Sequence, residues 1–174
     1  VVEGREIDDL DGGKDTNKLY KSLTHGQAPI IEHFDTAEEQ AAFIETLLAN
    51  SEVPTASTCV VARTNNEVSA IQELLELRGL KTSVIRPNKP EEDGAEALKL
   101  ATVHRVKGLE FDQVILASAN EGLVPLDSVI ASKADAVSQD DADTEERSLV
   151  YVGITRARKA AFVLSYGQPS RYFR

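Results

Sequence analysis

Blocks of apolar and polar residues follow one another along this chain and predict a succession of strands and helices. Short, nearly continuous apolar runs predict strands at residues 28–34, 58–63, 81–85, 98–103, 112–118 and 160–166. Apolar residues at helical spacing predict helices at residues 35–50, 65–79 and 144–158. Asp35 and Glu38 form a capping-box pattern at the start of the first helix, and Gly79 is placed to end the second.

The order of these elements predicts the class of fold. Strands and helices alternate, and the strands are apolar along their whole length rather than at every second position. This combination favours a mainly parallel sheet with helices on both faces, which is a three-layer α/β domain. Ligands bind such sheets at the carboxyl ends of the strands. We therefore expect residues 101–112, which join two predicted strands, to lie at that edge.

The remaining segments have compositions typical of irregular structure. Residues 1–27 are polar and contain glycine, which predicts an irregular N-terminal segment with at most one short helix over residues 16–23. Residues 86–97 carry two prolines, a glycine and an acidic cluster, which predicts a loop. Residues 121–143 are predicted to be a long polar connection that is mobile over its second half. This division leaves one folded domain over residues 28–174.

Composition narrows the class of protein. Hydrophobic residues make up 41% and charged residues 28% of the 174 residues, as in ordinary soluble globular proteins. A formal net charge of -10 argues against a free-standing nucleic-acid binder, although it is compatible with a local basic strip. The single cysteine, Cys59, excludes an internal disulfide and should be a small apolar filler of its strand.

The chain shows no signal peptide and no apolar run long enough to span a membrane. Together with the low cysteine content, this predicts a cytoplasmic protein. Because residue 1 is valine, we expect the sequence to be a domain of a longer chain.

Residues 101–112, "ATVHRVKGLEFD", gather polar groups between two apolar runs. Gly108 permits a positive φ or a close approach of the backbone to a ligand. Thr102, His104 and Lys107 offer donors suited to phosphate oxygens, and Glu110 is an acceptor suited to a pair of sugar hydroxyls. Each has an ordinary explanation when taken alone, such as a bond to a neighbouring carbonyl, a solvated turn or a pair with a nearby arginine. Together they point to a nucleotide or nucleic-acid edge.

Residues 145–158, "EERSLVYVGITRAR", form the second candidate cluster. On a helix, Leu149 and Val152 can bury while Arg156 projects from the later turns. An arginine held in this way is the usual electrostatic clamp for a transferring phosphoryl group. The alternative makes Arg156 and Arg158 cations at a helix C-terminus, where the helix dipole favours them. The residues alone leave both interpretations open.

The two clusters, "TVHRVKGLEFDQVIL" followed by "EERSLVYVGITRAR", resemble motifs V (about 101–112) and VI (about 145–158) of the UvrD/Rep/PcrA family of superfamily-one DNA helicases. Residues 59–85 are similar in pattern to the second RecA-like domain of that family. The resemblance implies a three-layer, P-loop NTPase-like domain that is the C-terminal one of a pair. It also implies ATP with Mg²⁺ as cofactor, and single-stranded or duplex DNA as partner.

The resemblance implies a role for each matching residue. Glu110 would bind the ribose hydroxyls of ATP, with Gly108 shaping the loop beside it, and Arg156 would reach the γ-phosphate as an arginine finger. Thr102, His104 and Lys107 would lie toward the DNA strand. Closing the cleft around ATP would shift this loop and its grip on the strand.

Two further residues of the second motif, Gly153 and Tyr151, would pack the helix and set its position.

Departures from the family pattern define what the chain lacks. It has no "GxxxxGK[ST]" phosphate loop and no apolar strand ending in the Asp-Glu pair that would hold Mg²⁺. The aromatic-Arg-Ser segment that stacks on adenine is missing too and is expected before residue 1. We therefore expect no metal bound by this chain, no hydrolysis by it alone, and a missing N-terminal RecA-like domain of the same parent chain as partner. Larger members of the family insert a subdomain where only residues 86–97 stand here.

Two competing interpretations remain. A RecD-like helicase would carry Gln-Gly-Ser-Glu-Phe in this loop, and the Lys-Gly-Leu at residues 107–109 favours the UvrD-like branch instead. From a different class, the chain could be a non-catalytic interaction module that keeps a helicase fold, with the acidic residues 135–146 as its binding surface. The presence of both Glu110 and Arg156 argues against a pure scaffold.

Overall fold

The computed structural model describes residues 28–86 and 96–174, together with the backbone of two short strands near the N-terminus. These strands, β1 (Glu6–Asp8) and β2 (Lys14–Thr16), pair with each other in antiparallel fashion. Apart from Thr16, which ends β2, the short helix expected over residues 16–23 lies outside the described residues, as does most of the loop expected at 86–97.

The described part of the chain is built around one sheet of six strands in the order β3-β8-β7-β4-β6-β5, and every neighbouring pair is parallel. The strands are β3 (Ile30–Phe34), β4 (Thr58–Ala62), β5 (Thr82–Val84), β6 (Leu98–Thr102), β7 (Phe111–Leu116) and β8 (Ala157–Tyr166). The parallel sheet and its six strands confirm the predicted α/β class.

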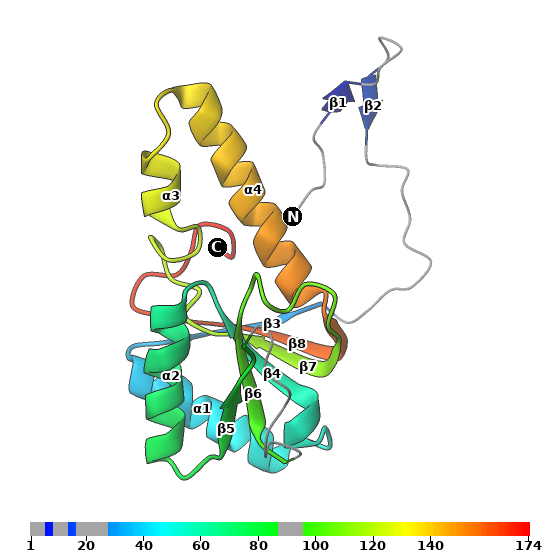
Figure 1. Ribbon diagram of the computed structural model, residues 1–174, viewed down its shortest axis with the longest axis vertical. Coiled ribbons are helices and arrows are strands. Elements are labelled where there is room, and N and C mark those ends of the chain that lie inside the picture. Colours follow the sequence, from blue (N-terminus) through cyan, green and yellow to red (C-terminus); the bar gives the residue numbers. More distant parts are fainter. Residues whose placement is uncertain (1–5, 9–13, 17–27, 87–95) are drawn as a thin grey trace.

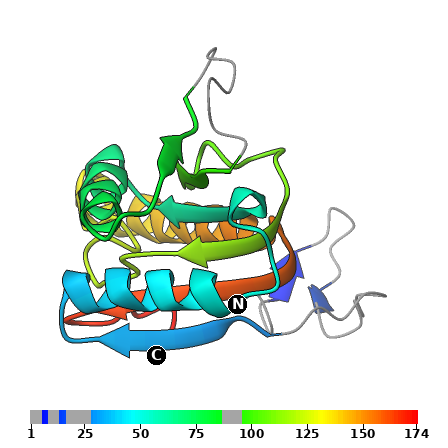
Figure 2. The ribbon, with the colours of Figure 1, turned by 90° about the horizontal axis from the view of Figure 1, so that it is seen from below.

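The helices are α1 (Ala37–Asn50), α2 (Asn65–Leu77), α3 (Asp127–Ala131) and α4 (Ala136–Ile154), with a short 3-10 turn over Thr55–Ser57. Helices α1 and α4 lie on opposite faces of the sheet, as Figures 1 and 2 show. Two apolar clusters fill the spaces between the layers. One joins α1 and α2 to the sheet, and the other joins α4 and the segment after β6 to the opposite face. The three-layer arrangement is therefore confirmed.

The start of α1 differs from the predicted cap by one residue. Thr36, not Asp35, is the N-cap, and its Oγ1 accepts a hydrogen bond from the backbone N–H of Glu39 at 3.2 Å. The Glu39 carboxylate in turn accepts from the backbone N–H of Asp35 at 3.0 Å. Glu39 thus supplies the reciprocal bond expected of Glu38, because a threonine cap shifts the box one position along the chain. Gly79 ends α2 as predicted, with a φ of 81°.

Residues 121–143 were expected to be a polar connection, and this expectation is wrong. They contain α3 and the first turns of α4. Asp135 caps α4 by accepting from the backbone N–H of Ser138 at 2.9 Å. Arg171 pairs with two carboxylates of this acidic segment. Its guanidinium contacts Glu121 and, at 3.0 Å, Asp143. The sequence hides this partner because Arg171 lies far along the chain, near the C-terminus.

Cys59 is fully buried in β4, where burial raises the pKa of its thiol, so the predicted role as a small apolar filler agrees with the structure. None of the helices in the described ranges combines the length and the apolar character needed to cross a membrane.

Candidate functional site

Residues 103–110 connect the carboxyl end of β6 to the amino end of β7. Because the two strands are parallel, this segment has to cross the sheet from the end where the strands finish to the end where they begin. We call these two ends the carboxyl edge and the amino edge. Val103 and Val106 are fully buried in the cluster under α4, so the segment is anchored against that face of the sheet. The side chains between and after them, His104 and Lys107 among them, are exposed.

Gly153 of α4 packs directly on this crossing segment. A Cβ atom added to Gly153 would lie 2.9 Å from Cγ1 of Val103, closer than side-chain atoms normally approach. Gly153 therefore has the packing role that the sequence suggested. Tyr151 is 51% exposed in the described structure, so about half of its surface packs within this domain. Its role in positioning the helix stays a prediction.

The amino edge of the sheet brings together Glu110, Arg156 and Arg158. The backbone N–H of Phe111, the residue after Glu110, donates to the carbonyl of Arg156 at 3.0 Å. Arg158 donates from Nε at 2.9 Å and from Nη2 at 2.5 Å to Oε2 of Glu110. The hydrogen bonds and the charge of Arg158 lower the pKa of the Glu110 carboxyl, and the charge of Arg156 adds to the effect. Glu110 and Arg156 therefore share one edge, as the sequence interpretation requires.

Arg156 lies beyond the end of α4, in the turn before β8, and not on the helix as predicted. Its Nε donates to the carbonyl of Val152 at 3.1 Å, which is the contact with a helix C-terminus that the alternative interpretation expected. Arg158 belongs to β8 and pairs with Glu110 instead of a helix end. The helix ends early because the chain must turn into a strand that pairs with Phe111.

The carboxyl edge holds the other group of predicted residues. Thr102 ends β6 and is 9% exposed, and His104 follows it with an exposed side chain. Burial and the nearby charge of Arg63 lower the pKa of His104. The expectation that all of residues 101–112 lie at the carboxyl edge is thus correct for Thr102 and His104 and wrong for Glu110. The two groups are separated because β6 and β7 are parallel, so the end of one and the start of the other lie at opposite edges of the sheet.

A buried ion pair lies beside His104 and was not singled out from the sequence. Arg63, which follows β4, donates from Nε at 2.8 Å and from Nη2 at 2.5 Å to the carboxylate of Glu146 on α4. Their side chains are only 9% and 5% exposed. Burial raises the pKa of Glu146, but the bonds from Arg63 and from the backbone N–H of Leu126 outweigh it and the net shift is downward. In the sequence, the only indication of this ion pair was Arg63 itself, a charged residue directly after the apolar strand β4.

Gly108 and Lys107 lie between the two edges. The φ of Gly108 is 85°, and a Cβ atom there would meet nothing within 4 Å. Glycine is therefore required for the backbone conformation of the turn, not for a close approach within this domain.

Residues 87–168 match the UvrD-like helicase C-terminal domain. The chain contains a UvrD-like helicase C-terminal domain. The predicted resemblance is thereby confirmed, and the whole crossing segment, residues 103–110, falls within the matched residues.

Relatives of this helicase domain include much longer proteins. The ATP-dependent DNA helicase PcrA of Leuconostoc citreum is 41% identical over 92 residues, which are 47% of this chain and 11% of that protein. The ATP-dependent DNA helicase Rep of Escherichia coli is 41% identical over 68 residues, 39% of this chain and 9% of that one. The chain thus spans about a tenth of the length of these relatives.

A solved structure has the same fold. It is the C-terminal domain of a possible DNA helicase from Lactobacillus plantarum, with a TM-score of 0.62 and 23% sequence identity. The alignment covers 84% of this chain and 78% of that one. The similarity therefore extends beyond the matched motifs to most of the parallel sheet.

Proposed function

We propose that this chain supplies the C-terminal half of the ATP site of an ATP-dependent DNA helicase, together with part of its DNA-binding surface. One observation carries the proposal. Within a UvrD-like helicase C-terminal domain, the carboxylate of Glu110 and the guanidinium of Arg156 come from separate motifs and reach the same edge of the sheet. The relatives named above are ATP-dependent DNA helicases, which supports the same activity here.

At the amino edge, Glu110 binds the ribose hydroxyls of ATP and Arg156 reaches its γ-phosphate. A carboxylate can accept from two neighbouring hydroxyls, and an arginine stabilises the charge that spreads over a transferring phosphoryl group. Among the guanidinium nitrogens of Arg156, only Nε has a hydrogen-bond partner within the described residues, the carbonyl of Val152. That bond fixes the guanidinium plane and leaves both terminal amino groups available to a phosphate.

The ATP site is completed by an N-terminal RecA-like domain of the parent chain. In the described part of the molecule, no group of three or more His, Cys, Asp or Glu side chains could hold a metal ion. The sequence also has neither a phosphate loop nor an apolar strand ending in an Asp-Glu pair, and on this basis we assign the Mg²⁺ ligands to the other domain. The contribution of this chain is the ribose contact and the arginine finger.

Thr102 and His104 at the carboxyl edge, together with Lys107 farther along the crossing segment, face the DNA strand. Arg105 and Lys107, close to His104 in the sequence, are exposed basic side chains in a chain whose net charge is -10. The crossing segment joins these residues to Glu110 and is anchored by two buried valines. Closing the two domains around ATP moves the segment as a unit, so nucleotide binding changes the contact with DNA.

The test uses the full-length protein that carries these residues. Arg156→Ala is expected to lower DNA-stimulated ATP hydrolysis roughly 10³-fold or more, the usual effect of removing an arginine finger. Affinity for single-stranded DNA, measured by fluorescence anisotropy, should stay close to that of the wild type. Lys159→Ala is the control, because Lys159 is an exposed cation close to Arg156 in the chain and pairs with Asp112.

Equal loss of hydrolysis and DNA affinity in Arg156→Ala would overturn the assignment of the finger. The 174-residue chain alone should hydrolyse no ATP. If the full-length protein also bound neither ATP nor DNA, the non-catalytic interaction module, with the acidic first half of α4 as its surface, would become the better interpretation.

A further inference from the structure

The pairing of β7 with β8 contains an irregularity at the candidate ATP edge. Phe111 pairs with Ala157, and the next pair in register is Gln113 with Ala160. Strand β8 therefore has one residue more than β7 between these pairs, which is a β-bulge at Arg158 and Lys159. Bulges of this kind occur next to active sites, where they redirect a side chain.

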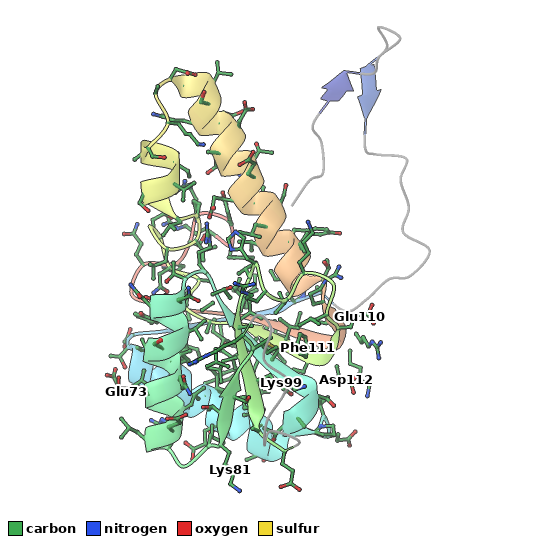
Figure 3. The ribbon with its side chains drawn as sticks, in the orientation of Figure 1. Glu73, Lys81, Lys99, Glu110, Phe111 and Asp112 are labelled. Carbon is green, nitrogen blue, oxygen red and sulfur yellow. The ribbon has the colours of Figure 1, made fainter. Side chains whose placement is uncertain are left out.

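The bulge explains why two consecutive cations both reach acidic partners. In a regular strand Arg158 and Lys159 would point to opposite faces. Here Arg158 binds Glu110, and Lys159 binds Asp112 with Nζ 2.9 Å from Oδ2. Phe111, between the two acids, turns inward and is 7% exposed. Figure 3 shows Glu110 and Asp112 at the outer end of the sheet with Phe111 toward the interior.

The bond between Arg158 and Glu110 uses only one carboxylate oxygen. Nε and Nη2 of Arg158 both donate to Oε2, and no hydrogen bond to Oε1 is found among the described residues. The side chains are 64% and 55% exposed, so the pair adds little to stability. What the pair does is restrict the rotation of a long, flexible carboxylate and leave its second oxygen available.

We propose that Arg158 is a positioning residue that sets the preference of this site for ribonucleotides over 2′-deoxyribonucleotides. It holds Glu110 by Oε2 so that Oε1 accepts from the sugar hydroxyl. This inference rests on the proposed ribose contact of Glu110. Fixing an acceptor before the ligand arrives lowers the entropy cost of binding. The same guanidinium lowers the pKa of Glu110 and so keeps the acceptor ionised.

The experiment compares KM and kcat for ATP and 2′-deoxyATP in the full-length protein, with DNA present at saturation. Arg158→Met is expected to raise KM for ATP about three- to tenfold, the effect of weakening one hydrogen bond. The kcat and the KM for 2′-deoxyATP should change little. Arg158→Lys, which keeps a charge but not the fork of donors, should recover part of the preference. Lys159→Met breaks the neighbouring ion pair of the same bulge and should leave the preference intact.

Glu110→Gln separates this inference from the one on which it rests. If the wild type has no preference for ATP, or if Glu110→Gln leaves that preference unchanged, the ribose contact itself is wrong and both proposals fail. If Glu110→Gln removes the preference while Arg158→Met retains it, only the positioning role of Arg158 fails. An equal rise in KM for both nucleotides in Arg158→Met would also overturn it, because that result indicates a general loss of charge near the phosphates.

Discussion

Two arginine–glutamate pairs lie at opposite edges of the sheet and differ in burial, not in distance. Arg63 and Glu146 approach to 2.5 Å at the carboxyl edge, and Arg158 and Glu110 approach to 2.5 Å at the amino edge. The first pair is 9% and 5% exposed, and the second is 64% and 55% exposed. Since Coulomb energy depends on the surrounding dielectric as much as on separation, the two pairs cannot have the same role.

The buried pair connects three parts of the chain. Arg63 follows β4, Glu146 lies on α4, and Oε2 of Glu146 also accepts from the backbone N–H of Leu126 at 3.1 Å. Removing either Arg63 or Glu146 would leave the charge of the other residue without compensation in the interior. The exposed pair has water as a competitor, and one of its oxygens is available to a ligand. Burial therefore separates the pair that holds α4 in place from the pair that can serve a site.

The largest expected effect comes from breaking the buried pair. Glu146→Gln keeps the shape of the side chain but leaves Arg63 buried without a counter-charge. We expect the free energy of unfolding to fall by about 3–5 kcal/mol, measured by chemical denaturation of the 174-residue chain. Replacing both residues by methionine should recover much of this loss, because the uncompensated charge is then gone.

The pH dependence of Glu146→Gln checks the same pair. The folded state lowers the pKa of Glu146 below its ordinary value of 4.5. Its ionised form therefore contributes stability that is fully present above pH 4.5 and is lost as pH falls through the lower, folded-state pKa. The difference in stability between wild type and variant should shrink over that acidic range. A constant difference down to pH 2 would mean that the charge of Glu146 is not what stabilises α4.

The next largest effect concerns the contact between α4 and the crossing segment. Gly153→Ala adds a methyl group 2.9 Å from Cγ1 of Val103. We expect a loss of about 1–3 kcal/mol, as for other overpacked cores, although alanine is the better helix former. Denaturation of Gly153→Ala in a Val103→Ala background is the control. In that background the Cγ atoms of residue 103 are gone, and its nearest remaining atom is Cβ, 3.9 Å from the new methyl group. The substitution should therefore lower the free energy of unfolding by less. Equal costs in both backgrounds would contradict this contact.

Much of the fold could be predicted because its signals are local. Apolar runs marked every strand of the parallel sheet, and Gly79 marked the end of α2. Where a distant residue decides the local structure, prediction failed. The first half of α4 carries Asp143, whose partner Arg171 lies near the C-terminus. Ser118 adopts a φ of 55° after β7, where its backbone N–H donates to Gln40 of α1. The sequence near these residues contains no pattern that indicates their distant partners, Arg171 and Gln40.

The residues of the candidate site stay a prediction, and the structure adds their geometry. The resemblance to motifs V and VI singled out Glu110 and Arg156, and the structure places them at one edge. The pairing of Glu110 with Arg158 was not predicted, because it depends on a bulge in β8 that shifts the register by one residue. Arg63 was also missed, since its partner Glu146 lies in an acidic run more than eighty residues away, where no single glutamate stands out.

The smallest expected effect is the one that separates the two pairs most sharply. Glu110→Gln and Arg158→Met each break a 2.5 Å ion pair, as Glu146→Gln does. Exposed pairs are screened by solvent and restrict two long side chains, so we expect no measurable change in the denaturation midpoint from either variant. Any residual coupling, determined from the double variant, should vanish at about 1 M salt, where the Debye length is about 3 Å. If either variant instead destabilised the chain as strongly as Glu146→Gln, the exposed pair would be a structural element of the amino edge. Glu110 would then not be available to a nucleotide, and the distinction by burial would fail.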